Sequence, residues 1–240
     1  MSVNNVVIQG KVISKPEVQF TYGIEKILEV KIEYKRISGK IDTFMVNFSH
    51  SLQSKFDVGD YIEIEGSIRS ASVAVEGCEY KKLKVYIFGS KITKLDEEPE
   101  VYKNQVELKD VELLKDPVLR KSYADDSIDI CDLKLRAFRN INKYSIIFCT
   151  CWNSNARLMA KYKKGVHLDL EGRLQSYCST MTNYLKMEVS VNSLNIKEDK
   201  VTEKDNAVEE STKDTEVDEN TTEEVKVEKE VKEDNVNAEV

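Results

Sequence analysis

Residues suited to catalysis are scarce in this 240-residue chain. Its only histidines are His50 and His167, and neither lies in a motif with a nucleophile or a carboxylate. There is no glycine-rich phosphate loop and no Walker pattern. His and Cys residues also lack the spacing of a metal site. We therefore expect a protein that is not an enzyme and that needs no metal or cofactor.

Long apolar runs and paired cysteines are also missing. No run approaches the roughly 18 residues that span a bilayer, and the start, Met-Ser-Val-Asn-Asn, does not resemble a secretory signal. The cysteines are odd in number and show no Cys-x-x-Cys spacing; they are Cys78, Cys131, Cys149, Cys151 and Cys178. We expect reduced thiols in a cytoplasmic protein that is not bound to a membrane, with Cys149 and Cys151 as small core residues.

Aromatic residues, proline and glycine are all absent after residue 197, where the chain is rich in Glu, Lys, Asp, Thr and Val. Such a segment buries too little apolar surface to offset chain entropy, so residues 198–240 are predicted to be a disordered acidic tail. Residues 199–240 hold 16 acidic and 6 basic side chains, a net charge of −10, whereas the whole chain carries −7. The body is therefore mildly basic, at +3, and the overall charge misleads about nucleic-acid binding.

A duplicated stretch organises the rest of the chain. Residues 59–70 and 165–176 align without a gap at an offset of 106. Apolar and polar residues alternate in both copies, which predicts a strand with one buried face, and the shared central glycine predicts a bend or bulge. Two unrelated strands are the alternative, but the match extends outward. The identical pairs are Gly59/Gly165, Glu65/Glu171, Gly66/Gly172 and Ser70/Ser176.

The repeat continues through the preceding segments. Residues 27–36 align with 130–139 at an offset of 103, and both alternate as strands. The next strand, 43–48, aligns with 144–152 if Phe44 is paired with Phe148 and Phe48 with Trp152. Turns are expected at 14–17 and 19–23, and short helices at 49–56 and 155–164.

Each unit then has about five strands and one short helix, with the helix between the third and fourth strands. This favours an all-β chain of two tandem OB-fold barrels, which are five-stranded Greek-key barrels. The predicted domains are residues 1–95 and 104–197. Residues 96–103, which are polar and hold one of only three prolines, are the predicted linker.

Aromatic and basic side chains alternate with the predicted core positions of the second unit. Leu133, Leu135 and Ala137 fit an inward face. A basic groove with aromatics on which bases stack is typical of single-strand binders. The candidate nucleic-acid-binding residues here are Lys134, Arg136, Phe138, Arg139, Phe148, Trp152, Arg173 and Tyr177. The alternative for Trp152 and Phe148 is a core position or a contact between subunits.

The first unit is poorer in such residues. Glu33 stands where the second unit has Arg136, and there is no tryptophan. We expect this unit to bind more weakly or to serve partly as structure. Its candidate residues are Lys31, Lys35, Arg36, Phe44, Phe48 and Arg69.

The sequence resembles the bacterial single-stranded DNA-binding protein family over about residues 4–196. In the second unit the likeness is carried by Asp-Pro-Val-Leu-Arg at 116–120, Cys-Trp-Asn at 151–153, Ala156, Lys-Gly at 164–165 and the strand ending Glu-Gly-Arg-Leu-Gln-Ser at 171–176. The first unit echoes the start of the family, Asn-Val-Val-Ile-Gln-Gly-Lys-Val at 5–12, and Lys-Pro-Glu at 15–17.

This resemblance implies that four OB folds wrap single-stranded DNA during replication, recombination or repair. Two folds per chain then imply a homodimer, and stacking falls on Trp152 and, less directly, on Phe148. Family members carry an acidic tail with a Pro-Phe tip that docks replication and repair enzymes. This chain ends Asn-Val-Asn-Ala-Glu-Val instead, so that docking stays open. We expect the tail to compete electrostatically for the basic groove of a cytoplasmic, nucleoid-associated protein.

Two other functions stay open on the sequence. One is an OB-fold protein-interaction module, such as a primosome accessory, with little or no DNA binding; the body charge of only +3 and Glu33 favour it. The other is single-stranded RNA binding, because stacking does not depend on the 2′-hydroxyl.

Overall fold

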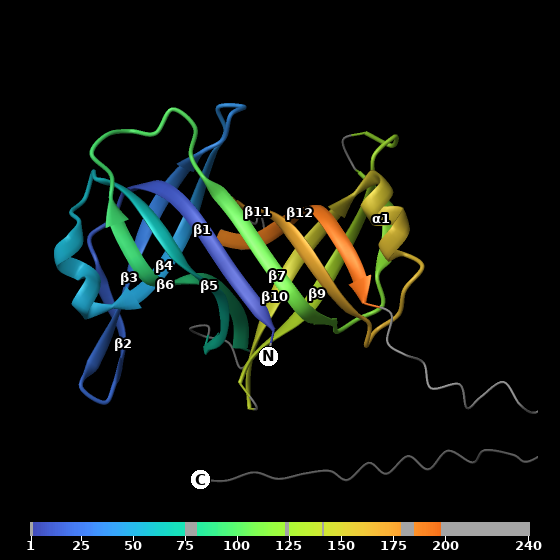
Figure 1. Cartoon of the computed structure of the whole chain (residues 1–240), viewed down its shortest axis with the longest axis horizontal. Coiled ribbons are helices and arrows are strands. Elements are labelled where there is room, and N and C mark those ends of the chain that lie inside the picture. The colour runs from blue at the N-terminus through green and yellow to red at the C-terminus, as the bar shows by residue number, and fades with distance from the viewer. Residues whose placement is uncertain (1, 75–80, 123–124, 141, 179–184, 198–240) are drawn as a thin grey trace, which may run out of the picture. The chain divides into compact units, whose positions relative to one another are not determined.

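The computed structural model describes residues 2–74, 81–122, 125–140, 142–178 and 185–197, and Met1–Val201 forms one compact unit (Figure 1). The predicted disordered tail lies outside the described residues. Among the described residues no helix has the length and apolarity to cross a membrane. The elements in chain order are β1 (Val3–Val12), β2 (Glu17–Tyr22), β3 (Glu25–Lys35), β4 (Ile41–Ser49), η1 (His50–Lys55), β5 (Tyr61–Ala74), β6 (Lys81–Lys94), β7 (Asn104–Leu113), β8 (Val118–Lys121), β9 (Asp129–Asn140), β10 (Lys143–Trp152), α1 (Asn153–Met159), β11 (His167–Cys178) and β12 (Leu185–Lys197).

Strand pairing follows the same order in both halves. In the first half β1 pairs with β5, β5 with β6, β6 with β4, β4 with β3, and β3 returns to β1. In the second half β7, β11, β12, β10 and β9 close in the same way. The predicted all-β OB-type fold is therefore confirmed. The domain boundaries themselves stay a prediction, because the two rings form one compact unit.

Two details differ from the prediction. Residues 19–23 were expected to form a turn, but β2 covers most of them and pairs with β3, as the short β8 pairs with β9. The two expected short helices are present after β4 and β10. The first, η1, is a 3-10 helix, and α1 both begins and ends earlier than the sequence suggested.

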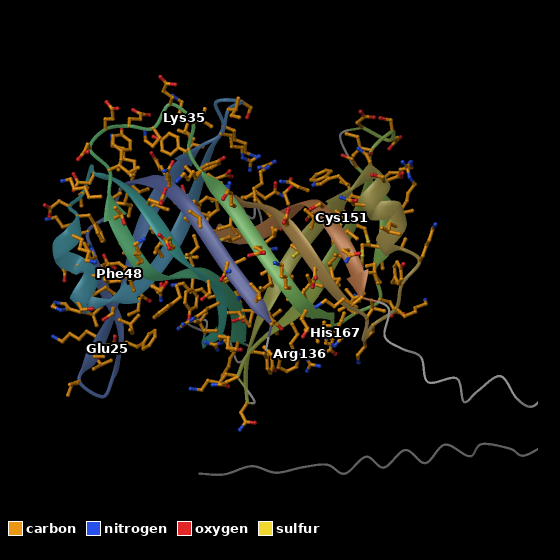
Figure 2. All side chains as sticks on the ribbon, viewed as in Figure 1. Glu25, Lys35, Phe48, Arg136, Cys151 and His167 are labelled. Atoms are coloured by element: carbon orange, nitrogen blue, oxygen red, sulfur yellow. The ribbon has the colours of Figure 1, made fainter. Side chains whose placement is uncertain are left out.

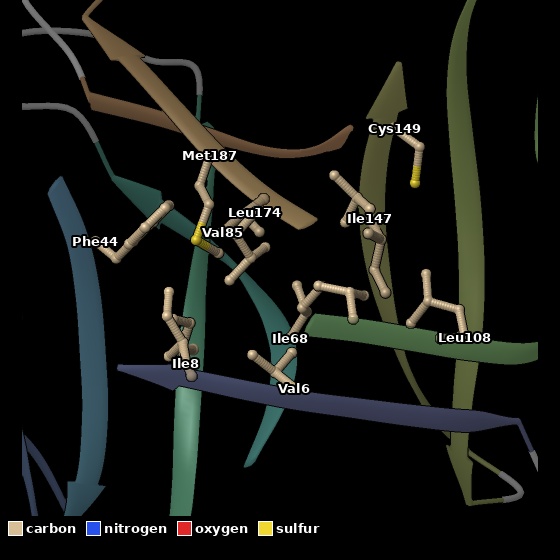
Figure 3. Close-up of a cluster of buried hydrophobic side chains, with 14 of the residues drawn as sticks. Val6, Ile8, Phe44, Ile68, Val85, Leu108, Ile147, Cys149, Leu174 and Met187 are labelled. Atoms are coloured by element: carbon tan, nitrogen blue, oxygen red, sulfur yellow. The ribbon is translucent and has the colours of Figure 1, made fainter. Parts of the chain in front are cut away.

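The two barrels are joined edge to edge by β1 and β7, which run antiparallel side by side (Figure 1). Val6 lies opposite Val106, and both side chains are almost fully buried. The buried residues of both barrels form one continuous apolar cluster (Figure 3). Burial of apolar surface is the main force in folding, so each barrel stabilises the other through this shared core.

The duplicated glycine sits at a bulge in both barrels. The register of β5 against β6 shifts at Gly66, and that of β11 against β12 shifts at Gly172. A Cβ at Gly66 would overlap the carbonyl oxygen of Phe88, and one at Gly172 would overlap that of Ser190. The predicted bend is therefore a bulge that only glycine fits, because the neighbouring backbone approaches too closely for a side chain.

The segment between the barrels is held to the first one. Glu98 accepts hydrogen bonds from the Tyr61 hydroxyl at 2.8 Å and from the Tyr102 hydroxyl at 2.9 Å. The hydrogen bond from Tyr61, and to a lesser extent that from Tyr102, lowers the pKa of the Glu98 carboxyl below its usual value. The Lys103 backbone N–H also donates to the Gln9 side-chain oxygen at 2.9 Å. Residues 98–103 therefore lie along the first barrel.

Replacing Gly66 by Ala tests the bulge. The added Cβ meets backbone atoms that cannot rotate away, so we expect a loss of roughly 1–3 kcal/mol in the free energy of unfolding. Urea unfolding followed by circular dichroism measures this loss. Ser72→Ala, at an exposed position of the same strand, is the control and should change little. Equal stability of Gly66→Ala and the wild type would contradict the close approach.

Candidate nucleic-acid interface

One outward face of the second barrel carries the predicted aromatic and basic residues. On β9 the inward residues Leu133, Leu135 and Ala137 are at most 2% exposed, which confirms the predicted alternation. The side chains between them face outward. Across β9 and β10, Lys134 lies opposite Phe148 and Phe138 lies opposite Tyr144. Apart from Arg139, the candidate side chains of both strands therefore share one surface.

Arg136 lies among rings at one end of this face. Its guanidinium is 4.9 Å from the centre of the Phe138 ring and 5.7 Å from that of Tyr144. The two rings lie edge to face, with centroids 6.4 Å apart. Arg136 also pairs with Glu112 at 2.5 Å. Its charge is therefore partly balanced, and Tyr144, at 47% exposed, is the more open contact.

Trp152 and Phe148 lie between the core and the surface. Both are partly buried, and Phe148 packs on the shared core. The Trp152 indole N–H donates to the Ser190 hydroxyl at 3.2 Å. This bond satisfies the one polar atom of the ring and fixes its orientation. Neither side chain is fully buried, so both keep some surface open to a ligand, and their role in binding stays a prediction.

These two rings line a groove of about 870 Å³. The second barrel supplies most of its wall, and the β6 strand of the first barrel supplies the rest through Lys82, Leu83 and Val85. Tyr177, which is 44% exposed, and Lys186 lie on its rim, with the Lys186 ammonium 5.9 Å from the tyrosine ring centre. The groove thus combines exposed ring edges with cations at its border.

Carboxylates also lie in the groove. Asp132 forms a two-point ion pair with Arg120, at 3.0 and 3.2 Å. Glu188 is partly buried, and burial raises the pKa of its carboxyl despite hydrogen bonds from Gln175 and Thr150. The Gln175 amide donates to it at 2.6 Å. An anion passing through the groove would therefore meet two acidic groups that the sequence analysis did not single out.

Phe44 and Phe48 are corrections to the prediction. Both are 0% exposed, inside the first barrel (Figure 2). The sequence alignment of the β4 and β10 strands was displaced by one residue. Lys31 lies opposite Met45 and Lys134 lies opposite Phe148, so Met45 is the counterpart of Phe148. A shift of one residue in a strand moves every side chain to the other face.

The first barrel therefore has no outward ring where the second has Phe148 and Trp152. Their counterparts by register are Met45 and Ser49. An ion pair between Lys84 and Glu29, both largely buried, covers the corresponding surface. A ring on the same face of β6 is Phe88, with the Arg69 guanidinium stacked 3.4 Å from its centre.

The remaining candidates are spread over both barrels. Lys31 and Lys35 are exposed on β3, whereas Arg36, which follows β3, forms an ion pair with Asp42. Arg173 is partly exposed on β11. It lies opposite Ser190 of β12, the residue to which the Trp152 indole is hydrogen-bonded. Arg69 and Arg139 lie away from the groove, where the barrels meet. Arg120 lines the groove but was not among the predicted residues, because it lies on β8, a strand of four residues that is too short to show a pattern.

Cys149 and Cys151 are confirmed as buried core residues. Cys131, Cys149 and Cys151 are buried, and Cys178 is exposed. Burial raises the pKa of the Cys151 thiol to about 12 and that of Cys131 to about 11. These thiols are therefore protonated at neutral pH and poor metal ligands. No group of three His, Cys, Asp or Glu side chains within the described ranges is placed to hold a metal.

Comparison with solved structures identifies the fold. The single-stranded DNA binding protein from Thermus aquaticus superimposes with a TM-score of 0.64, at 21% identity, over 82% of this chain and 93% of that one. A deletion mutant of the same protein gives a TM-score of 0.65, at 22% identity, over 85% and 98%. The N-terminal domain of PriB from Thermoanaerobacter tencongensis matches 39% of this chain and 98% of its own, with 27% identity and a TM-score of 0.34. No family model and no curated protein sequence matches the chain.

Replacing Glu188 by Gln tests the acidic group in the groove. Because burial raises the pKa of this carboxyl, its charged form costs folding free energy above that pKa, and the cost is relieved as the pH falls through it. The variant should be more stable than the wild type at pH 7, and the difference should vanish on acidification. Urea unfolding at a series of pH values measures it, with Glu25→Gln as the exposed control. A variant less stable at pH 7 would contradict this assignment.

Proposed function

We propose that the protein binds single-stranded DNA with little sequence preference, and that the groove of the second barrel is its main contact surface. Bases would stack on Trp152, Phe148 and Tyr177, while Lys134, Lys186 and Arg173 would contact phosphates. Base stacking on aromatic rings contributes roughly 1–3 kcal/mol per base and tolerates any base, since each has a π-face.

The observation that supports this proposal best is the placement of Trp152. Its polar atom is satisfied by Ser190, and its ring borders a groove of about 870 Å³ together with two other aromatic side chains. The fold shared with the Thermus aquaticus single-stranded DNA binding protein adds support, because that protein carries the proposed activity in its name.

The two barrels would contribute unequally. The first lacks the rings of the second at the matching positions, and the ion pair of Lys84 with Glu29 covers that surface. Its role would be to wall the groove with β6 and to stabilise the second barrel through the shared core. Glu33 and the absence of a tryptophan in the first unit suggest the same weaker binding by the first barrel in the sequence.

Assembly and tail function extend the same proposal. We infer a homodimer, in which four barrels face one strand of DNA, acting in replication, recombination or repair. The acidic tail, with a net charge of −10 over residues 199–240, would compete with DNA for the basic groove. Domains 1–95 and 104–197 would then act as one binding body.

Titration with oligo-dT tests the function directly. The single tryptophan, Trp152, should be quenched on binding, and affinity should fall as salt rises because counterions are released. Trp152→Ala should weaken binding by about 5- to 150-fold, the equivalent of one lost stack, and because this variant has no tryptophan its binding is followed by the fluorescence anisotropy of labelled oligo-dT. Phe20→Ala, which removes a 47% exposed ring from the first barrel, is the matched control and should have no effect.

The same titration separates the alternatives. Absence of quenching and of any complex at low salt would reject single-strand binding and leave the protein-interaction module. Equal competition by matched RNA and DNA oligonucleotides would broaden the ligand to any single strand. Stronger competition by RNA than by DNA would make single-stranded RNA the proposed ligand.

A further inference from the structure

The two barrels meet at a pair of seams related by the internal repeat. At one seam the Thr43 backbone N–H donates to the Ser176 hydroxyl oxygen at 2.9 Å. At the other the Ile146 backbone N–H donates to the Ser70 hydroxyl oxygen at 2.8 Å. Ser70 and Ser176 are the serines that close the duplicated strand, so one repeated residue makes the same bond twice. We call these contacts the Asp42 seam and the Ser145 seam, after the residue that precedes the donor.

Charge is balanced at the Asp42 seam. The Asp42 side chain is 0% exposed and accepts two bonds from Arg36, at 2.5 and 2.7 Å. It also accepts the Ser176 backbone N–H at 3.0 Å. A buried carboxylate with three donors is well satisfied. The hydrogen bond to Asp42 raises the pKa of the Arg36 guanidinium.

The Ser145 seam keeps the cation and lacks the carboxylate. Asp42 lies opposite Tyr34 and Ser145 lies opposite Ala137, so Ser145 holds the place of Asp42. Arg139 correspondingly holds the place of Arg36. Within the described part of the chain, its hydrogen bond joins a terminal nitrogen to the Tyr144 carbonyl oxygen at a long 3.4 Å.

A second arginine joins it from the first barrel. Arg69 precedes Ser70 and stacks on the Phe88 ring. Burial, and then the positive charge of Arg139, lower the pKa of the Arg69 guanidinium, so the two cations lie within electrostatic reach. Among the described residues, four buried side-chain polar atoms have no partner. Three of them belong to this seam: Arg69 Nε, Arg139 Nε and Ser145 Oγ.

Such an arrangement favours an anion. Two half-buried guanidinium groups without a carboxylate are costly, because each charge loses water without gaining a counter-charge. Guanidinium groups present planar donors that match the oxygens of phosphate. Stacking on Phe88 orients Arg69 through the face of the guanidinium and uses none of its N–H groups.

We propose that Arg69 and Arg139 form a phosphate site at the Ser145 seam, where a backbone phosphate of the bound strand takes the role that Asp42 has at the other seam. This rests on the proposed function and deepens it. The strand crosses from one barrel to the other at the Ser145 seam, because at the Asp42 seam the arginine is already paired with a buried carboxylate.

The test introduces at the Ser145 seam a carboxylate like the one that Asp42 supplies at the other seam. In the full chain, Ser145→Asp should pair with Arg139, raise Tm, and weaken oligo-dT binding about tenfold, with a salt dependence reduced by about one phosphate contact. Ser145→Asn, which has the same size without the charge, should stay within about twofold of the wild type. Equal weakening by both variants would show a steric effect and overturn the proposal.

If Ser145→Asp does not fold, a second pair of variants tests the same site. Arg139→Gln and Arg69→Gln should each weaken oligo-dT binding, whereas Lys143→Gln, which removes an exposed cation from the same hairpin, should do so much less. Equal effects of all three would indicate diffuse attraction and overturn the site.

Inorganic phosphate separates this inference from the function. Phosphate, compared with chloride at equal ionic strength, should raise the Tm of the wild type but not that of Arg139→Gln. DNA binding that all of these variants leave unchanged would overturn the phosphate site and leave the proposed function standing. A wild type that binds no DNA would overturn the function, while Arg139-dependent protection by phosphate would still support an anion site.

Discussion

The pairing of β1 with β7 is the constraint on which the rest of the structure depends. It joins two barrels of like topology through a continuous ladder of backbone hydrogen bonds. An exposed strand would be a site for unwanted pairing, and here β1 and β7 cover each other. The apolar faces behind the ladder form one continuous core, and this shared core stabilises both barrels.

This joint also explains why the two barrels can differ in surface. The core and the seams need the residues that repeat, such as Gly66 with Gly172 and Ser70 with Ser176. Outward positions are not bound by that requirement. There the second barrel carries Trp152 and Phe148, and the first carries Ser49 and Met45. The proposed binding surface thus lies where the repeat has diverged.

The sequence predicted the repeat, the all-β fold and the glycine bulges, because period-two alternation and a shared mid-strand glycine are local signals. It also predicted correctly which residues of β9 face inward. It was wrong for Phe44 and Phe48, because no gap or turn marked the register of β4, and aligning ring with ring displaced the strand by one residue.

Other features had no local signal. The ion pair of Lys84 with Glu29 joins residues far apart in the chain, and so does the hydrogen bond from Ser176 to Asp42. The raised pKa of Glu188 depends on burial by neighbouring strands. Such contacts arise only when both barrels are closed and joined, and a linear pattern does not contain them.

Photochemical crosslinking of the full chain to oligo-dT, with the attached peptides identified by mass spectrometry, tests the central claim most directly. The account predicts crosslinks on the outward face of the second barrel, at Trp152, Phe148 or Tyr177, and few in the first barrel. Crosslinks confined to the first barrel, or to the strands β1 and β7 that join the two, would contradict it.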